Sequence, residues 1–416
     1  MPADLASPHA VALDERTATV EPFSGIAELL AALGSRGAIP NFEPLDKNIR
    51  SVVIFGCGHL GKSTLAGATS AGLDVLAFAD NNQANWGTRI AGIEVVSPQE
   101  AVRRYNDEAF FVAAIYNGTA PRKQLADLNC KRIVPYPLFF FRFSQYMPFE
   151  DRLELPARVI AEPQAIYAGY ALLNDARSRL EFLAQIRWRC TLDYTCLVKP
   201  DPPDEMYYAP DLVSLGPNEV LVDCGAFDGD SIRMFLAKID ATHGTFRHIY
   251  AIEPDAKNRT ALAGYLASLP DNVSRRISVL PYGLSDSDEV VSFDASGTVG
   301  SRVVAGAGSE TIHCRRLDDI LDGPQPTLIK MDIEGAEPRA ILGAAATIRA
   351  SRPILAMCVY HRCEHLWTLP VLIHNALPDY KIFLRRYAEE CWETVYYAVP
   401  PERLASPSKL PGDAKP

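Results

Sequence analysis

Acidic side chains and glycines follow several apolar runs in the C-terminal half of this 416-residue chain. The first group is Asp223-Cys-Gly-Ala-Phe-Asp-Gly229, which lies between a predicted strand and a predicted helix. Gly225 permits a tight turn and lets a ligand approach the backbone. Because the loop carries Asp223, Asp228 and Asp230, it is a poor cradle for a pyrophosphate. The same acids suit a cationic sulfonium and an ammonium group.

Two further polar groups follow later strands. Glu253 ends an apolar run and is placed to accept hydrogen bonds from both hydroxyls of a ribose. Lys330-Met-Asp-Ile-Glu-Gly-Ala-Glu337 puts Asp332, Glu334 and Glu337 after another run. In an open parallel sheet, ligands bind beyond the carboxyl ends of the strands, where the strand order reverses. We therefore expect the three groups to share one site, although each alone is equally typical of helix caps and glycine turns.

Three residues are candidate general bases for removing a proton from an alcohol: Asp332, Glu334 and His361. His361 follows a predicted strand, a position that is equally typical of a surface histidine. The three carboxylates that follow Lys330 could hold a hard divalent cation. The alternative, which the sequence favours, is a carboxylate pair ordered by Lys330 and Arg339.

A second glycine loop lies in the N-terminal half. Gly56-Cys-Gly-His-Leu-Gly61 follows an apolar run and opens a predicted helix, and Asp80 comes about twenty residues later. Gly56, Gly58 and Gly61 with Asp80 have the spacing of a dinucleotide-binding fingerprint. Two alternatives stay open: the domain is a scaffold without a ligand, in which Gly61 serves helix packing, or Asp80 simply caps a turn.

The elements that must position these residues alternate between apolar strands and amphipathic helices. Such alternation predicts doubly wound parallel sheets. In the N-terminal half we expect strands at 51–55, 73–79, 109–115 and 131–134, with a helix at 62–71. In the C-terminal half we expect strands at 219–222, 249–252, 276–280, 327–331 and 354–359, helices at 231–238, 256–268 and 338–350, and an extra β segment at 290–293 and 311–314.

The expected fold class is therefore α/β, with two Rossmann-like doubly wound domains joined by a helical connector. Apolar residues at helical spacing between 170 and 186 indicate the connector. The expected organisation is a disordered N-terminus at 1–21, a first domain at 22–149, the connector at 150–206, a second domain at 207–400 and a flexible tail at 401–416.

Composition and charge limit the function classes. The chain is 48% hydrophobic and 22% charged, as in ordinary globular proteins. A formal net charge of -10 disfavours nucleic acid as a partner, because phosphate contacts need clustered Lys and Arg. Nine cysteines without a C-x-x-C pair are typical of reduced thiols in a cytoplasmic protein. The start has no signal-peptide pattern, and no run of roughly 18 apolar residues predicts a membrane span.

The three acidic groups together resemble the FkbM family of methyltransferases over about residues 207–399. The resemblance extends to Tyr282-Gly-Leu-Ser-Asp286 and Arg352-Pro353. It implies S-adenosylmethionine (SAM) as the cofactor, with Asp332 and Glu334 facing the transferred methyl group or the acceptor. Members of this family mostly methylate hydroxyl groups of sugars or polyketide-type products. The residues that the resemblance assigns to the cofactor are Asp223, Gly225, Asp228 and Gly229 near the methionine moiety, Glu253 at the ribose, and Tyr282 and Gly283 near the adenine.

The N-terminal half is similar to a different family. Residues 52–98 resemble the N-terminal nucleotide-sugar-binding domain of sugar acetyltransferases. The matching pieces are Gly56-Cys-Gly58, Asp80-Asn-Asn82, Trp86-Gly87 and Gly92-Ile-Glu-Val-Val-Ser-Pro98. This resemblance implies a second site, for a nucleotide or nucleotide-sugar, at Gly56, Gly58, Gly61 and Asp80.

The sequence thus predicts a SAM-dependent methyltransferase that acts on a hydroxyl of a sugar, a nucleotide-sugar, a glycan or a related natural product. Its expected partner is a small-molecule or glycan acceptor. Two alternatives stay open. One is a nucleotide-sugar-binding or scaffold protein with an inactive methyltransferase fold, and the other is an NAD-dependent oxidoreductase that uses the N-terminal domain.

Overall fold

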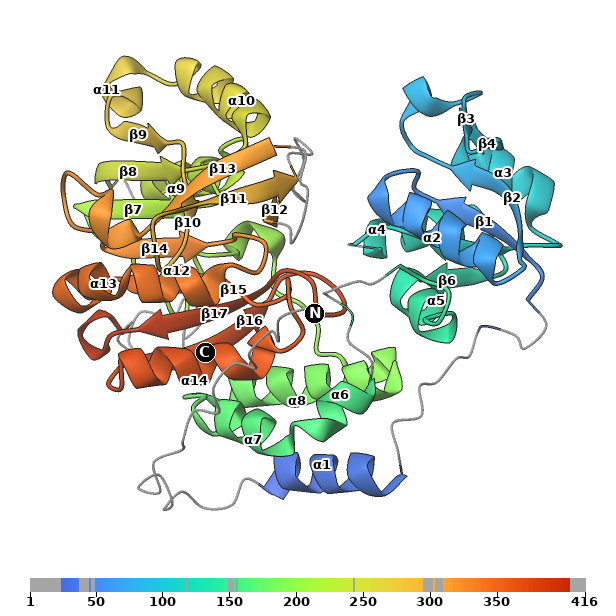
Figure 1. The fold of residues 1–416 in the computed structure, drawn as a ribbon, viewed down its shortest axis with the longest axis horizontal. Coiled ribbons are helices and arrows are strands. Elements are labelled where there is room, and N and C mark those ends of the chain that lie inside the picture. Colours follow the sequence, from blue (N-terminus) through green and yellow to red (C-terminus); the bar gives the residue numbers. More distant parts are fainter. Residues whose placement is uncertain are drawn as a thin grey trace, which may run out of the picture.

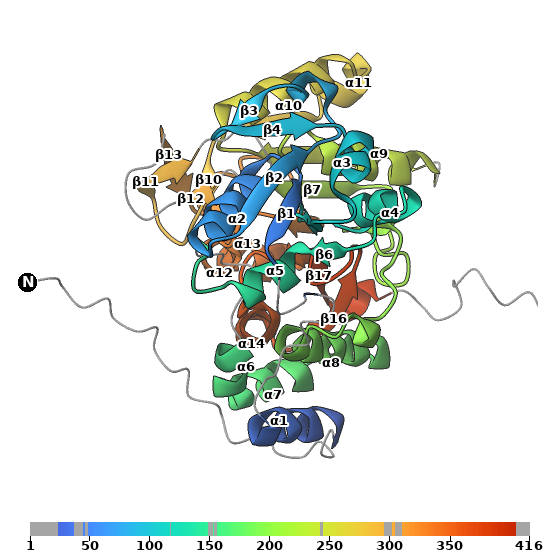
Figure 2. The same ribbon diagram turned by 90° about the vertical axis from the view of Figure 1, so that its right-hand side faces the viewer.

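The computed structural model shows two large, mainly parallel sheets with their helices, a small four-stranded sheet and a further group of helices (Figures 1 and 2). The segment predicted to be disordered, 1–21, and most of the predicted tail lie outside the described residues. Within the described part of the chain, no helix is long and apolar enough to cross a membrane. The described residues are 24–36, 45, 49–116, 118–148, 153, 156–241, 244–294, 302–303 and 310–404.

The described residues of the N-terminal half form a six-stranded sheet in the order β3-β4-β2-β1-β5-β6. Strand β1 runs parallel to both β2 and β5, and its last four residues are buried, as expected when helices cover both faces. The four predicted strands are confirmed, and the hairpin β3–β4 is an addition. The elements are β1 (Ser51–Phe55), α2 (His59–Ser70), β2 (Asp74–Ala79), β3 (Arg89–Ile90), β4 (Ile93–Val96), α3 (Pro98–Tyr105), β5 (Phe110–Ala113), α4 (Thr119–Asp127), β6 (Ile133–Pro135) and α5 (Tyr136–Arg142).

The C-terminal sheet has seven strands in the order β16-β17-β15-β14-β7-β8-β9. The five predicted strands are confirmed and are mutually parallel, whereas β17 runs antiparallel to β15 and β16. The prediction missed β16 and β17. The strands are β7 (Glu219–Cys224), β8 (Phe246–Ile252), β9 (Ile277–Leu280), β14 (Leu328–Met331), β15 (Ile354–Cys358), β16 (Lys381–Arg386) and β17 (Thr394–Val399).

Strand order reverses once within the parallel part of each sheet. In the C-terminal sheet, successive strands run from β7 through β8 to β9 toward one edge, and the chain then returns to the other side of β7 at β14. In the N-terminal sheet the corresponding reversal lies between β1 and β5. A crevice for a ligand is expected beyond the carboxyl ends of the strands at each of these two points.

Helices and a small second sheet complete the C-terminal domain. The predicted helix at 338–350 is divided at Ala344 into α12 and α13. The extra β segment is confirmed as part of a four-stranded sheet in the order β10-β13-β11-β12. The elements are α9 (Asp230–Ala241), α10 (Ala256–Ala267), α11 (Asp271–Ser274), β10 (Gly283–Leu284), β11 (Glu289–Asp294), β12 (Arg302–Val303), β13 (Glu310–Arg315), α12 (Glu337–Gly343), α13 (Ala345–Ser351) and α14 (His365–Ala376).

The helical connector comprises α6 (Pro156–Ala161), α7 (Pro163–Ala171) and α8 (Ala176–Thr191). Helix α8 packs on the edge strand β16, below the large sheet in Figure 1. Helix α1 (Ser24–Arg36) contacts α6, α7 and α8. The expected boundary placed α1 in the first domain, at 22–149, whereas α1 packs on the connector helices.

Candidate active site

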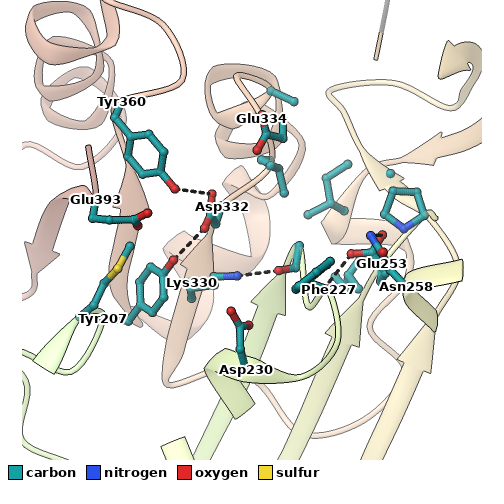
Figure 3. A pocket seen from close by; sticks show the side chains of 18 of the residues that line it. Tyr207, Phe227, Asp230, Glu253, Asn258, Lys330, Asp332, Glu334, Tyr360 and Glu393 are labelled. Atoms are coloured by element: carbon teal, nitrogen blue, oxygen red, sulfur yellow. Dashed lines mark hydrogen bonds between the residues drawn. The ribbon is translucent and has the colours of Figure 1, made fainter. Parts of the chain in front are cut away.

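A cavity of about 460 Å³ lies at the carboxyl ends of β7, β8 and β14, beside the reversal of strand order (Figure 3). Its size is that of an ordinary small-molecule site. Six of the predicted site residues line it: Gly225, Glu253, Tyr282, Gly283, Asp332 and Glu334. Other lining residues include Tyr116, Met206, Tyr207, Phe227, Asp230, Asn258, Leu284, Phe293, Ile312, Lys330, Tyr360, Tyr387, Trp392 and Glu393.

The loop after β7 requires glycine at its first position. Gly225 has a φ of +82°, and a Cβ added there would lie 1.9 Å from the carbonyl oxygen of Asp332. Only glycine adopts this conformation without cost and leaves room for the neighbouring backbone. The close approach brings the loop after β7 and the loop after β14 together on one wall of the cavity.

Glu253 connects the end of β8 to the loop after β7. Its Oε2 accepts a hydrogen bond from the backbone N–H of Phe227 at 2.9 Å, and its Oε1 accepts one from Asp255 N–H at 2.8 Å. Burial raises the pKa of Glu253 above its ordinary value, although these hydrogen bonds oppose the shift. A carboxylate has about four acceptor sites, so the group retains capacity for a ligand hydroxyl.

Lys330, which lines the cavity, forms a buried ion pair with Asp223 behind it. The Lys330 Nζ lies 2.9 Å from Asp223 Oδ1 and donates to the carbonyl oxygen of Gly225 at 2.6 Å. Burial alone lowers the pKa of Lys330, but the carboxylates of Asp223 and Asp332 outweigh this and raise it, so the ammonium stays charged. The Ser231 hydroxyl donates a hydrogen bond to Asp223 Oδ2 at 2.5 Å. The Asp223 carboxylate is fully buried and does not line the cavity.

The acids of the β7 loop are therefore arranged differently from the expectation. Asp223, Asp228 and Gly229 do not line the cavity. Asp228 pairs with Arg233 at 2.6 Å instead, with its side chain partly exposed. Of the three acids expected to surround a cationic ligand, Asp230 alone faces the cavity.

Asp332 lies between the Glu253 side of the cavity and the Glu393 side (Figure 3). Its carboxylate accepts a hydrogen bond from Tyr207 at 2.8 Å and a long one from Tyr360 at 3.5 Å. Burial raises the pKa of Asp332, but His361, Lys330 and Tyr207 together lower it well below its ordinary value. Asp332 is therefore ionised at neutral pH.

The predicted ordering of this carboxylate by Lys330 and Arg339 needs correction. Lys330 lies close enough to affect Asp332, but its direct contacts are with the β7 strand and loop. Arg339 instead binds Asp286 and Glu289, each at 2.5 Å. The reason is that Arg339 belongs to α12, which packs beside β10 and the loop that follows it.

His361 lies behind the cavity and not at the surface, so the alternative of a surface histidine is wrong. Its side chain is buried, with Nδ1 2.9 Å from Glu337 Oε1. Its Nε2 lies 3.1 Å from Asp332 Oδ1 and 3.5 Å from Glu334 Oε1. Burial alone lowers the pKa of His361, but the three surrounding carboxylates raise it well above its ordinary value.

Glu393 and Trp392 line the cavity, although neither was a predicted site residue. Both precede β17, in a part of the chain for which no element was predicted. Burial and the neighbouring charge of Asp332 raise the pKa of Glu393 to about 7. The Trp392 ring contacts Tyr116 edge-on, with ring centroids 5.1 Å apart.

Contacts with the rest of the chain hold the segment that carries Trp392 and Glu393. The buried carboxylate of Glu390 accepts from Trp392 Nε1 at 2.7 Å and from Tyr194 Oη of the connector region at 3.0 Å. It also pairs with Arg122 of the N-terminal domain at 2.9 Å. All three parts of the chain therefore position this side of the cavity.

Residues 223–382 match the family model described as the methyltransferase FkbM domain. The C-terminal region of the chain contains an FkbM methyltransferase domain. The matched range begins at Asp223 and ends in β16, so it includes Gly225, Glu253 and Asp332. Tyr116, Tyr207 and the Trp392–Glu393 pair lie outside it, which means that part of the cavity wall is built by segments beyond the FkbM domain.

A crystal structure of methyltransferase FkbM from Methylobacillus flagellatus KT is similar over 90% of this chain and 98% of that chain, with 23% identity and a TM-score of 0.68. At this identity the likeness shows a shared fold, which includes the N-terminal half. An rRNA methylase from Streptococcus thermophilus is 12% identical over 48% of this chain and 96% of that chain. Its TM-score of 0.30 is too low to indicate a shared fold. No curated protein matches the sequence at a significant level.

The N-terminal glycine loop lies apart from the FkbM domain's cavity, and Gly56, Gly58, Gly61 and Asp80 do not line it. The carboxylate of Asp80 accepts hydrogen bonds from Cys57 N–H at 3.0 Å and from Asn82 N–H at 2.8 Å. A Cβ on Gly61 would lie 2.0 Å from the carbonyl oxygen of Gly56, so this glycine permits close packing of α2 on the loop after β1. These contacts fit the structural alternative that the sequence left open.

Proposed function

We propose that this protein is a SAM-dependent O-methyltransferase whose acceptor is a hydroxyl of a sugar, a nucleotide-linked sugar or a related natural product. The observation that carries the proposal is one cavity, at the strand-order reversal of the FkbM domain, that joins the Gly225–Glu253 wall to Asp332 and Glu393. A methyltransferase needs a nucleoside site and an acceptor site that meet at one point, and a single continuous cavity of this size supports such an arrangement. The nine cysteines are scattered and include no C-x-x-C pair, a usage that favours a cytoplasmic location for the enzyme.

The cofactor would occupy the side of the cavity that contains Glu253. In this arrangement Glu253 accepts hydrogen bonds from the ribose hydroxyls, and Asp230 faces the ammonium of the methionine moiety. The adenine would lie near Tyr282 and Gly283, where Leu284, Phe293 and Ile312 add apolar surface. Asp223 contributes indirectly, because its ion pair with Lys330 supports the loop.

The proposed reaction is an in-line displacement. The acceptor oxygen attacks the methyl carbon, the new C–O bond forms as the C–S bond breaks, and the sulfonium becomes a neutral thioether. The hydroxyl proton must pass to a base as this happens. Glu393 is the best-matched base, because its pKa of about 7 lies near the working pH. Asp332, held by Tyr207, orients the acceptor.

The acceptor side of the cavity combines aromatic rings with carboxylates, which fits a sugar ring. Trp392 and Tyr116 offer apolar faces to the carbon side of such a ring, while Glu393 and Asp332 can accept from its hydroxyls. Tyr116 follows β5, next to the strand-order reversal of the N-terminal sheet. A nucleotide attached to the sugar would therefore extend toward the strand-order reversal of the N-terminal sheet.

Titration calorimetry with SAM and with NADH tests the proposal directly. We expect SAM to bind the full chain and NADH not to bind, and we expect transfer of a labelled methyl group to a sugar or nucleotide-sugar from a panel of acceptors. If SAM does not bind and Glu253→Ala changes nothing, the proposal fails. Binding of NADH instead would favour the oxidoreductase alternative.

A further inference from the structure

The buried histidine behind Asp332 faces two carboxylates at the spacing of metal ligands. We propose that Asp332, Glu334 and His361 bind one divalent transition-metal ion at the acceptor side of the cavity. One ligand atom from each of the three residues lies within 4.8 Å of a ligand atom from each of the others. Among the described residues, these three form the group of His, Cys, Asp or Glu side chains that is close enough together to hold an ion.

The distances within the group are already close to those of a metal site. His361 Nε2 lies 3.1 Å from Asp332 Oδ1 and 3.5 Å from Glu334 Oε1. Nitrogen and oxygen atoms bound at about 2.1 Å to one ion lie about 3.0–3.4 Å apart in octahedral or tetrahedral geometry. Small side-chain rotations would therefore complete the coordination.

The Nε2 atom of His361 is an independent sign of a ligand. The side chain is almost fully buried, and Nε2 points at the two carboxylates without the geometry of a hydrogen bond to any described residue. A buried imidazole nitrogen that lacks a well-aligned hydrogen bond costs free energy unless a ligand satisfies it. A bound cation would do so.

The opposite nitrogen of His361 is held as in known metal sites. Its Nδ1 lies 2.9 Å from Oε1 of the fully buried Glu337, which also accepts from Ile333 N–H at 3.2 Å. Metal-binding histidines almost always donate their second N–H to a carboxylate or carbonyl, which fixes the tautomer and aims the free nitrogen at the ion. Glu337 would therefore be the supporting residue and not a ligand, unlike in the sequence-based interpretation.

The ligand set selects the class of ion. One imidazole with two carboxylates suits Mn²⁺, Fe²⁺, Co²⁺ or Zn²⁺, whereas Mg²⁺ and Ca²⁺ prefer oxygen alone. Asp332 and Glu334 line the cavity, so the open coordination positions would face the acceptor. There the ion would hold an acceptor hydroxyl and lower its pKa, a role that rests on the proposed function.

The test titrates the full chain, freed of metal with a chelator, with MnCl₂ and follows free Mn²⁺ by electron paramagnetic resonance. Mn²⁺ is the better probe because it binds thiolates weakly, so the nine cysteines interfere less than with Zn²⁺. We expect one ion per chain, and at least tenfold weaker binding in each of Glu334→Gln and His361→Gln. Glu337→Gln should weaken binding by about 10–100-fold without removing a ligand. Glu402→Gln is the matched control, since it removes an exposed carboxylate that does not line the cavity.

Equal Mn²⁺ binding by the wild type and the Glu334→Gln variant would overturn the proposal, as would no binding by the wild type. If His361→Gln fails to fold, which the absence of a cooperative unfolding transition would show, Glu334→Gln still tests the proposal. Glu334 lies on the cavity wall, so its substitution does not disturb a packed core. A parallel SAM titration separates the two proposals. SAM binding without Mn²⁺ binding removes the metal site alone, and Mn²⁺ binding without SAM binding removes the proposed function alone.

Discussion

Both glycine loops of this chain donate a backbone N–H to a carboxylate at the end of the next strand, and they differ in what faces them. In the N-terminal domain, Asp80 at the end of β2 accepts from the N–H of Cys57 in the glycine loop at 3.0 Å. In the FkbM domain, Glu253 at the end of β8 accepts from the N–H of Phe227 in the corresponding loop at 2.9 Å. A carboxylate that closes a glycine loop is therefore a structural device common to both.

The two loops differ in the residue that faces them from the strand on the other side of the strand-order reversal. A Cβ on Gly56 would lie 2.9 Å from the Ile115 side chain, which follows β5, whereas a Cβ on Gly225 would meet the backbone of Asp332. The first loop faces an apolar residue and the second faces an ionised acid. In each domain the glycine loop therefore defines a shape, while the neighbouring strand supplies the chemistry.

The largest effect is expected from Asp332→Asn. Turnover should fall by about 10²–10⁴-fold, because the acceptor loses the carboxylate that orients it, while SAM affinity stays unchanged. Initial rates with labelled SAM and calorimetry on the same preparation measure the two quantities. Asp80→Asn is the control at the other loop and should leave turnover unchanged. Full turnover in Asp332→Asn would remove this residue from the mechanism.

Glu253→Gln tests whether the two loop-closing acids have different functions. The variant should bind SAM about 10–100-fold more weakly, since hydrogen bonds to a charged group contribute about 1.5–3 kcal/mol. Asp80→Asn should bind SAM like the wild type. Calorimetric Kd values check both. Equal weakening in the two variants would mean that the comparison between the loops is wrong.

Gly225→Ala measures how tightly the two loops of the FkbM domain are joined. The added Cβ meets the Asp332 carbonyl and the backbone has a φ of +82°, so we expect a loss of more than about 2 kcal/mol in the free energy of unfolding. Gly58→Ala is the control, because no atom lies within 4 Å of its added Cβ. It should change stability by about 0.5 kcal/mol or less. Denaturant unfolding measures the free energy of unfolding of both variants. Similar losses of stability in the two would contradict the prediction.

The smallest effect is on the pH dependence of stability, and it has opposite signs for the two acids. Burial raises the pKa of Asp80, but hydrogen bonds from Cys57, Asn82 and Asn85 hold it below its ordinary value of 3.8. Its stabilising contribution is therefore present above pH 3.8 and lost as the pH falls through the folded-state pKa. For Glu253, burial raises the pKa above 4.5, so its contribution is present below pH 4.5 and lost as the pH rises through the folded-state pKa.

Melting temperatures across an acid series measure this difference. The wild type should gain stability over Asp80→Asn as the pH rises toward 3.8. It should lose stability relative to Glu253→Gln as the pH rises above 4.5. If the stability differences of the two variants from the wild type changed with pH in the same way, the assigned directions of the two pKa shifts would be wrong.

Sequence patterns predicted the elements that local rules determine. The short apolar runs of β7, β8 and β14 are typical of buried parallel strands, and Gly225 and Glu253 follow from the turn and strand end that they occupy. Sequence could not show that Asp228 turns toward Arg233, or that Lys330 holds Asp223 away from the cavity. Those choices depend on which neighbours the folded chain brings together.

The Glu393 side of the cavity was missed for a related reason. The run Thr394–Val399 has high β propensity and offered a signal for β17, but nothing local marks the residue before it as functional. Glu393 gains its shifted pKa only from burial beside Asp332, which precedes it by 61 positions. Such long-range proximity has no period or spacing in the sequence.

The contact between Arg122 and Glu390 has a consequence for modularity. Excising residues 207–400 as a stand-alone catalyst would remove Arg122 and Tyr194, and the buried Glu390 would lose two of its partners. An uncompensated buried charge would then loosen the neighbouring Trp392 and Glu393. Domain-exchange experiments should therefore keep the N-terminal domain with its own FkbM domain, because contacts from both hold the Trp392–Glu393 side of the cavity.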